Sequence, residues 1–285
     1  MGSPRNLRRW ADNTLLPYPS CFYYFTRAVL LLGGGVFRLV YGNGSKFKKI
    51  FAGLVKPLDT VPIGVTSNGM ELRALTPDKN MMIEVVIPAS CFEVVEVAED
   101  TVLALSRDSF LRAIRRASKQ DSITLSYEKA SRYVRFLLSN IKTGVEREFN
   151  IEVSEAIESL VEPLSIELPV KFQIATDDLK KLIRDVKIVG DELEITFREN
   201  SIEVSSSSEG KSYRTSLRLD RPLYQLESKE VLVSSKYDAD YLKTVAGAIT
   251  VADLVSVEFG SGLPMKIYAP LEDGSKITIW IAPRI

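Results

Sequence analysis

An internal repeat with a spacing of 132 residues constrains this chain more than any other feature. When the sequence from Val36 onward is shifted by 132 positions, its beginning, middle and end align with a later part of the chain without gaps. One offset that holds throughout predicts two tandem copies of the same fold. The aligned segments are residues 47–51 with 179–183, 68–72 with 200–204 and 146–149 with 278–281, and Phe110 and Ile114 with Leu242 and Ala246.

Each copy has the residue pattern of a small α+β domain. Apolar residues at i, i+3, i+4 and i+7 predict a helix with one apolar face, and alternating segments predict antiparallel strands. Asn68-Gly69 predicts a hairpin. Because alternating strands need one covered face, we expect two helices packed on a sheet in each copy. The expected elements are helices at 45–58, 107–119, 176–187 and 238–248 and strands at 37–41, 61–65, 70–74, 82–87, 123–127, 133–137, 255–259 and 277–281.

The first 35 residues differ in composition from the rest. They contain Arg5, Arg8 and Arg9, followed by an apolar run, residues 21–32, that a fourth arginine, Arg27, interrupts. The run is too short to span a membrane, and Arg27 weakens its resemblance to a signal peptide. We interpret residues 1–35 as a non-native start, with Val36 as the initiator read from a non-ATG codon, or as a disordered or processed tail.

An acidic segment separates the two copies. It carries five glutamates and no basic residue, with Leu160, Leu164 and Ile166 around Pro163. It is either a solvated connector or an extended arm that presents apolar side chains to a partner. The predicted order is the extension 1–35, domain 36–151, linker 152–169 and domain 170–285.

The residue inventory argues against several enzyme classes. There is no histidine, and Cys21 and Cys91 are not in a C-x-x-C pair, so His-dependent triads and cysteine zinc sites are not expected. The Gly-Lys-Ser triplet at 210–212 lacks the glycine of a phosphate loop, because Ser205 is in its place. We therefore expect no catalytic residues, no metal and no cofactor.

Positive charge is concentrated in the helices of a chain with zero net charge. Segments 45–58, 106–119, 176–187 and 235–248 together carry 15 basic and 6 acidic residues, against 37 of each in the whole chain. A basic face on one helix is usually only a solvated face. A bias of the same sign in three of four helices of a repeated fold favours a shared polyanion such as DNA.

Four motifs give the chain a specific resemblance. They are FKKIF at 47–51, GMELRAL at 69–75 before a Thr-Pro loop, VEPLSI at 161–166 and APRI at 282–285. With them, residues 36–285 resemble the proliferating cell nuclear antigen (PCNA) family of DNA sliding clamps in its archaeal form. The resemblance implies a closed trimeric ring of six similar domains, with helices lining the hole and sheets forming the outer wall.

The resemblance also implies partners and sites. A closed ring holds DNA by topology, so weak phosphate contacts without sequence readout suffice. The implied role is to tether DNA polymerase, flap endonuclease and DNA ligase, after loading by a clamp loader, on double-stranded DNA in the cytoplasm at the nucleoid, with no membrane involved. The implied trimer consists of this chain alone or of this chain with paralogues. Subunits are expected to join through strand pairing of residues 147–153 with 212–218.

The implied site residues fall into three sets. The DNA-facing set is Lys46, Lys48, Lys49, Arg107, Arg112, Arg115, Arg116, Lys119, Lys180, Lys181, Arg184, Lys187, Lys236 and Lys243. The partner-peptide pocket is Leu75, Leu164, Ile166, Pro264, Trp280, Ala282, Pro283 and Ile285. The subunit interface is Arg147, Phe149, Ile151, Val153, Tyr213, Thr215 and Leu217.

The chain departs from the family pattern in its loop at 76–80, its neutral charge and its extension. Two alternatives stay open at this point: a monomeric DNA-binding module and a carboxylate-dependent nuclease.

Overall fold

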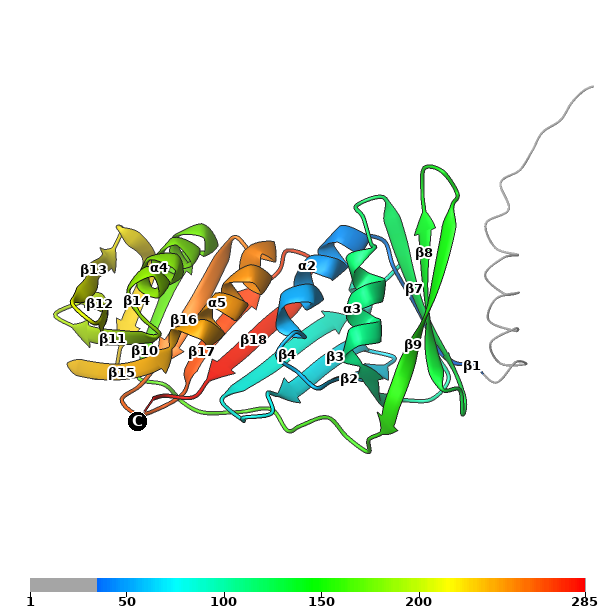
Figure 1. The fold of residues 1–285 in the computed structure, drawn as a ribbon, viewed down its shortest axis with the longest axis horizontal. Helices are drawn as coiled ribbons and strands as arrows, with labels where there is room; N and C mark the ends of the chain where they lie inside the picture. Colours follow the sequence, from blue (N-terminus) through cyan, green and yellow to red (C-terminus); the bar gives the residue numbers. More distant parts are fainter. Residues whose placement is uncertain (1–34, 285) are drawn as a thin grey trace, which may run out of the picture.

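The computed structural model describes residues 35–284, and its two halves have the same order of elements (Figure 1). In each half a strand precedes a helix, five strands follow, and a second helix precedes three closing strands. The first helices begin at Gly44 and Thr176 and the second helices at Arg107 and Ala239, so each pair is offset by 132 residues.

The bounds of the elements are as follows. The first half contains β1 (Gly35–Tyr41), α2 (Gly44–Leu54), β2 (Thr60–Thr66), β3 (Gly69–Leu75), β4 (Met81–Pro88), the short 3-10 helix η1 (Ala89–Cys91), β5 (Val94–Val97), β6 (Thr101–Ser106), α3 (Arg107–Arg115), β7 (Asp121–Glu128), β8 (Tyr133–Asn140) and β9 (Glu146–Ala156). The second half contains β10 (Val170–Ala175), α4 (Thr176–Val189), β11 (Glu192–Arg198), β12 (Ser201–Ser208), β13 (Lys211–Leu219), β14 (Pro222–Ser228), β15 (Leu232–Asp238), α5 (Ala239–Ala248), the 3-10 helix η2 (Ile249–Val251), β16 (Leu254–Phe259), β17 (Met265–Pro270) and β18 (Lys276–Ile281).

The strands form three sections of one sheet that runs through both halves. The order is β5-β1-β7-β8-β9 in the first section and β15-β11-β12-β13 in the last. The middle section, β6-β2-β3-β4-β18-β17-β16-β10-β14, crosses from one half to the other where β4 pairs with β18. The two halves therefore share a continuous sheet as well as a linker.

All four helices lie on one face of this sheet, in the order α4, α5, α2, α3 (Figure 1). Their apolar stripes bury residues such as Phe51, Phe110, Ile183 and Val245. At the contact between the halves α2 and α5 approach closely, because a Cβ on Gly53 would be 3.5 Å from the Cβ of Ala248. The helices thus form a single row, and among residues 35–284 the opposite face of the sheet carries no α-helix (Figure 1).

Polar residues fix where the helices begin. The Asn43 side chain accepts a hydrogen bond from the Lys46 amide at the start of α2, and Asp238 accepts one from the Asp240 amide at the start of α5. In α3 the charges follow the helix dipole, with Asp108 in the first turn and Arg112 and Arg115 in the last.

The structure differs from the sequence prediction in several places. Helix α3 ends at Arg115, so Lys119 lies beyond it, and α5 begins at Ala239, so Lys236 lies on strand β15. Strand β9 continues to Ala156, so the first residues of the predicted linker are strand. The hairpin at Asn68-Gly69 turns at residues 67–68, one position earlier than the dipeptide suggests. Of the predicted extension, residues 1–34 lie outside the described residues.

The repeat also contains a two-residue slip at its end. Phe149 of β9 pairs with buried Phe136, as Ile279 of β18 pairs with buried Ile267. Phe149 therefore corresponds to Ile279, at an offset of 130 residues. The gapless alignment with Ile281 placed it two residues too far along, because the hairpin loops of the two halves differ in length.

Candidate nucleic-acid interface and associated sites

Exposed basic side chains lie on the open side of the helix row. The apolar faces of the helices are buried against the sheet, so their exposed residues point away from it. Within residues 35–284, eight basic residues of the predicted DNA-facing set have no ion-pair partner. One of them, Lys48, is bound to backbone carbonyls, and the other seven could contact phosphates without first breaking an ion pair. They are Lys49, Arg112, Arg115, Arg116, Lys119, Arg184 and Lys243.

Other members of the DNA-facing set already have acidic partners. Lys46 lies 2.6 Å from Asp273 of the second half, an ion pair that holds the two halves together. Lys187 lies between Asp191 and Asp240, at 2.5 and 2.8 Å. The remaining pairs are Lys180 with Asp177, Lys181 with Asp178, Arg107 with Asp108 and Lys236 with Glu192.

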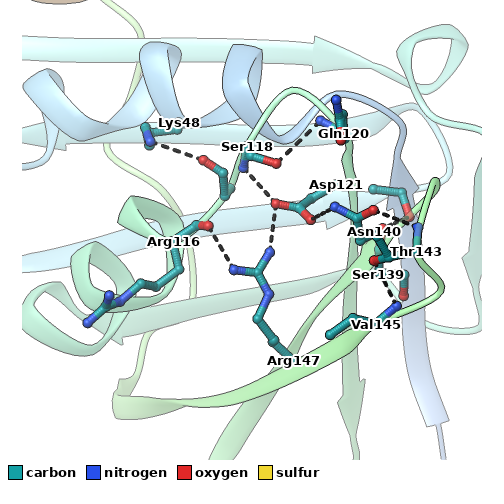
Figure 2. A network of polar contacts seen from close by, with 12 residues as sticks. Lys48, Arg116, Ser118, Gln120, Asp121, Ser139, Asn140, Thr143, Val145 and Arg147 are labelled. Carbon is teal, nitrogen blue, oxygen red and sulfur yellow. Dashed lines mark hydrogen bonds and ion pairs between the residues drawn. The ribbon is translucent and has the colours of Figure 1, made fainter.

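Lys48 is part of a polar network beside the end of α3 (Figure 2). Its Nζ donates to the carbonyl oxygens of Arg115 and Ala117, at 3.3 and 3.0 Å, so it caps a helix C-terminus. Nearby, the Arg147 guanidinium of β9 donates to the Arg116 carbonyl at 3.3 Å. Lys48 therefore acts first as a structural cap.

Asp121 is the centre of this network and its side chain is fully buried. Its carboxylate lies 2.7 Å from Arg147 Nη2 and accepts from the Ser118 amide, at 2.7 Å, and from Asn140 Nδ2, at 3.3 Å. Burial acts to raise the pKa of Asp121, but the hydrogen bonds from Ser118 and the charge of Arg147 outweigh it and hold the pKa below its ordinary value. The edge strand β9 is thus anchored to β7, β8 and the end of α3.

The predicted pocket residues surround the seam between β4 and β18 on the face without helices. Trp280 pairs across the strands with Met82, which pairs in turn with Leu75. Trp280 is only 3% exposed, because Ile166, Leu168 and Leu263 pack around it and Met82. Lys266 Nζ lies 5.5 Å from the Trp280 ring, a cation–π contact. Trp280 and Ile166 therefore pack below the exposed residues of this surface and are not themselves freely accessible.

Leu75 and Leu164 are the exposed apolar members of the pocket set, at 40% each. Leu75 also borders a groove of about 400 Å³ between the linker and strands β2, β3 and β6. Arg73 crosses its floor, where Nη1 donates to the Val161 carbonyl at 3.0 Å and ties the linker to the sheet. The linker is therefore held against the first half and is not a free tether.

The C-terminal segment completes this surface. The Ala282 amide donates to the Asn80 carbonyl at 2.8 Å, and Pro283 forms a bridge with Tyr237 of β15. The loop at 76–80 is itself ordered, because Thr76 Oγ1 donates to Asp78 at 2.6 Å. Ala282, Pro283 and Pro264 are half-buried, and Ile285 lies outside the described residues.

Within residues 35–284, strands β9 and β13 each have one edge that is open over most of its length, because β6 pairs with β9 only at residues 153–156 and β14 pairs with β13 only at residues 218–219. The Val153 amide donates to Arg132 of the β7–β8 turn, and the Val145 carbonyl accepts from Asn140 of β8. Because amides alternate along a strand, the odd-numbered amides of β9 face β8, and the amides of Glu146 and Glu148 point to the open edge. Phe149 and Tyr213, near these edges, are only partly buried.

Comparison with known proteins agrees with this architecture. Residues 36–159 match the model of the proliferating cell nuclear antigen N-terminal domain. DNA polymerase sliding clamp 2 of Sulfurisphaera tokodaii is 29% identical over 249 residues, which cover 87% of this chain and 99% of that protein. DNA polymerase sliding clamp 1 of Saccharolobus solfataricus is 29% identical over 252 residues, covering 88% and 100%. A crystal structure of PCNA from Thermococcus kodakaraensis superposes with a TM-score of 0.80 at 22% identity, covering 87% of this chain and all of that one.

The first domain matches the PCNA family model, and 87% of the chain is similar to archaeal sliding clamps. The chain has the PCNA-like α+β fold of two similar domains, each with two helices on antiparallel sheet. Sequence reasoning missed the supports of its surfaces: Met82, Leu168 and Lys266 around Trp280, and Asp121 under Arg147. The adjacent Met81-Met82 pair in a strand next to the Thr-Pro loop was the one signal that pointed to Met82. The sequence spacing of Asp121 and Arg147 does not predict their contact, which arises because β8 pairs with both β7 and β9.

Proposed function

We propose that this chain is a subunit of a DNA sliding clamp, a ring that encloses duplex DNA and keeps a DNA polymerase on it. The observation that carries the proposal is the row of four helices on one face of a sheet that continues through both domains (Figure 1). Within residues 35–284, each of the four helices in that row presents at least one exposed basic side chain without an ion-pair partner. These side chains would hold a phosphate backbone beside the row without sequence readout, which permits sliding.

The DNA-facing residues that we propose are the exposed basic residues without acidic partners. Lys49, Arg112 and Arg115 come from α2 and α3, and Arg184 and Lys243 from α4 and α5. The residues held in ion pairs, such as Lys46 and Lys187, contribute to the positive potential and reach phosphate only by exchanging partners. The proposed location of the protein is on DNA at the nucleoid. Within residues 35–284 no helix is long and apolar enough to cross a membrane.

Partner enzymes are proposed to bind the face without helices, at the linker. Leu75 and Leu164 are exposed there, and burial of such side chains contributes roughly 25 cal/mol per Å². A partner peptide with apolar anchors would cover them and pair with the C-terminal segment near Ala282. The proposed partners are polymerase, clamp loader, flap endonuclease and DNA ligase.

Topological retention on DNA tests this function. The chain is loaded by its clamp loader and ATP onto a nicked circular plasmid and isolated by gel filtration at high salt. A clamp stays with the circle and leaves when a restriction enzyme linearises it. A protein that binds DNA by contact alone dissociates from both forms alike, and that outcome would overturn the proposal.

A further inference from the structure

A groove of about 490 Å³ opens in the second domain, and none of its lining residues belongs to the three predicted sets of site residues. It lies between the ends of β11, β13, β14 and β15, at the opposite end of the molecule from β9 (Figure 1). Phe197 and Leu226 are its most buried apolar residues, and exposed Leu219 and Val231 line its mouth. The groove is therefore apolar inside and open at the surface.

The apolar residues around the mouth are exposed to an unusual degree. Val231 is 88% exposed, and its neighbour Leu232 and Leu219 are more than half exposed. Single apolar residues on a surface need no explanation, but several of them beside an apolar groove form a patch that is stabilised when a partner covers it.

The first domain provides an internal comparison. Its β5–β6 turn corresponds to the β14–β15 turn, because β2 pairs with β6 as β11 pairs with β15. That turn carries exposed Glu99 and Asp100 where the second domain has exposed Val231 and Leu232. The same turn thus forms without apolar residues, so their presence in one domain only indicates a role in binding and not in folding.

Two carboxylates line the groove, and both belong to ordered turns. Glu199 is in the two-residue β11–β12 turn, which the Ser201 hydroxyl closes with a 2.8 Å hydrogen bond to the Arg198 carbonyl. Glu230 is in the β14–β15 turn, where the Ser228 hydroxyl donates to the Glu230 carbonyl at 2.7 Å and accepts from its amide at 3.1 Å. Because both turns are formed before binding, little conformational entropy is lost when a ligand enters.

The charges in the groove have one sign. Glu199 and Glu230 are the only charged residues of its lining, and within residues 35–284 Glu230 has no ion-pair partner. Glu199 has only a 4.0 Å contact with Arg198 and is itself exposed. An apolar side chain next to a lysine or arginine matches both features, because the first fills the groove while the second faces the carboxylates.

The groove also lies beside the end of the linker. The Lys229 amide, in the β14–β15 turn, donates to the Pro169 carbonyl at 2.9 Å, and Lys229 Nζ lies 3.2 Å from Glu167. The five residues from Leu164 to Pro169 span at most about 18 Å when extended. A protein bound at Leu164 would therefore have the groove within reach of the sequence that flanks its anchors.

We propose that this groove is a second docking site for a partner protein and that its ligand is a peptide segment with an apolar side chain beside lysine or arginine. Attachment of the same partner at the linker rests on the proposed function, whereas the groove and its chemistry do not. The partner would thus be held at two separate places on one subunit.

Selection from a library of short random peptides tests the proposal on the purified full chain without DNA. Peptides that bind the unaltered chain are counter-selected on the double variant Leu219→Ser with Val231→Ser. Both side chains are exposed, so the variant should keep its fold, which thermal melting checks. We expect the groove-dependent peptides to carry an apolar residue next to Lys or Arg. A library without groove-dependent peptides overturns the proposal, and so does enrichment of acidic ones.

Fluorescence anisotropy of a selected, labelled peptide then measures each feature. The double serine variant should raise the Kd at least about tenfold, and Glu199→Gln with Glu230→Gln about threefold with a weaker salt dependence. Leu254→Ser, which removes an exposed apolar side chain from the start of β16, is the matched control and should bind like the unaltered chain. Equal Kd values for all variants would contradict the proposal.

Sedimentation velocity of the same proteins separates another occupant. Self-association that Val231→Ser abolishes would make a second copy of the chain the occupant and overturn the proposal. Neither peptide binding nor sedimentation uses DNA, so failure of this inference leaves retention on circular DNA, the test of the proposed function, unaffected. A chain that binds the peptides but is not retained would do the reverse.

Discussion

At the scale of single residues, polar contacts decide which basic side chains are free to bind DNA. Lys48 caps the C-terminus of α3, and Lys46 forms an ion pair between the two halves. The nearby residues Lys49 and Arg115 are exposed. A count of charges along the sequence cannot distinguish these four basic residues. The geometry separates a group with structural roles from a group that is free to bind phosphate.

Substituting the free group should weaken DNA binding selectively. Lys49, Arg112 and Arg115 changed together to Glu should reduce retention on DNA and lower the salt dependence of binding by about 0.9 in slope for each phosphate that the variant no longer neutralises. Lys129, Arg132 and Lys229 changed to Glu, outside the helix row, make a control with the same net charge. Fluorescence anisotropy on duplex DNA across a salt series measures both, and equal effects of the two variants would argue against the helix row.

Removal of the buried carboxylate should lower stability at neutral pH. Asp121→Asn removes the negative charge beside Arg147 and replaces one of the two acceptor oxygens by a donor, so Ser118, Asn140 and Arg147 no longer all have an acceptor; it should reduce the free energy of unfolding by about 1–3 kcal/mol. The pKa of Asp121 is lowered in the folded protein, so its contribution is present above the unfolded pKa of about 3.9 and is lost as pH falls through the folded pKa. Urea unfolding at pH 7 and near pH 3 should show the difference shrink in acid. Asp100→Asn, at an exposed site, should show none.

At the scale of elements, β9 is hydrogen-bonded to β8 along one edge, and most of its other edge has no strand neighbour within residues 35–284. The open side consists of the amides and carbonyls of its even-numbered residues, as the hydrogen bonds of Val153 and Val145 establish. Strand β13 has the same arrangement. Its two-residue turn at 209–210 places Lys211 opposite Ser208, so the amide of Arg214 faces outward and that of Thr215 faces β12.

Proline substitutions should distinguish the open edge of each strand from its hydrogen-bonded edge. Glu148→Pro and Arg214→Pro remove donors at the open edges and should abolish self-assembly while the chain keeps most of its stability. Thr215→Pro removes a donor to β12 and should destabilise the domain itself. Sedimentation combined with thermal melting distinguishes these outcomes. Unchanged assembly of both edge variants would place the interface elsewhere.

The linker gives a second test at this scale. Leu164→Ser should weaken binding of a partner peptide by about 1–2 kcal/mol without affecting stability, because the exposed side chain contacts little in the free protein. Ile166→Ser should weaken peptide binding and also lower the melting temperature, since Ile166 packs against the Trp280 cluster. Equal peptide affinities of unaltered chain and Leu164→Ser would reduce the linker to a connector.

The helices and strands themselves could be predicted from the sequence, but the contacts between distant elements could not. Periodicity in residues 47–54 and 179–186 was enough for two helices, and alternation was enough for most strands. The length of α3 was overestimated because Arg116 and Lys119 continue a helix-compatible composition beyond the last hydrogen-bonded turn. Trp280 was expected at a binding surface, yet it is buried, because burial depends on Ile166 and Met82 from distant parts of the chain.

At the scale of the whole molecule, the contact between the halves is the feature on which the rest depends. It combines the β4–β18 ladder, the Lys46–Asp273 ion pair and the approach of α2 to α5. These three contacts lie on the sheet, at a turn and in the helix row. They fix the angle between the domains, and that angle determines whether copies of the chain can close on themselves.

A side chain inserted between α2 and α5 should disturb this angle. Gly53→Leu places atoms against Ala248 and should destabilise the chain by about 1–3 kcal/mol and impair assembly. Gly247→Leu, on α5 with no atoms within 4 Å of its Cβ, is the matched control. Guanidinium unfolding and native mass spectrometry measure the two effects. Equal behaviour of the variants would mean that the helix contact does not set the geometry.

The β4–β18 ladder has a mechanical consequence for any ring built from this chain. In a ring of three copies, every second seam would be reinforced by the polypeptide itself, through the linker, and the seams between would be held by strand edges alone. Stress applied by a loading machine would then concentrate at the unreinforced seams, and rupture of one of them is enough to admit a double helix sideways. The continuous sheet within each copy would serve as a stiff arc, and the β9–β13 edge as the latch.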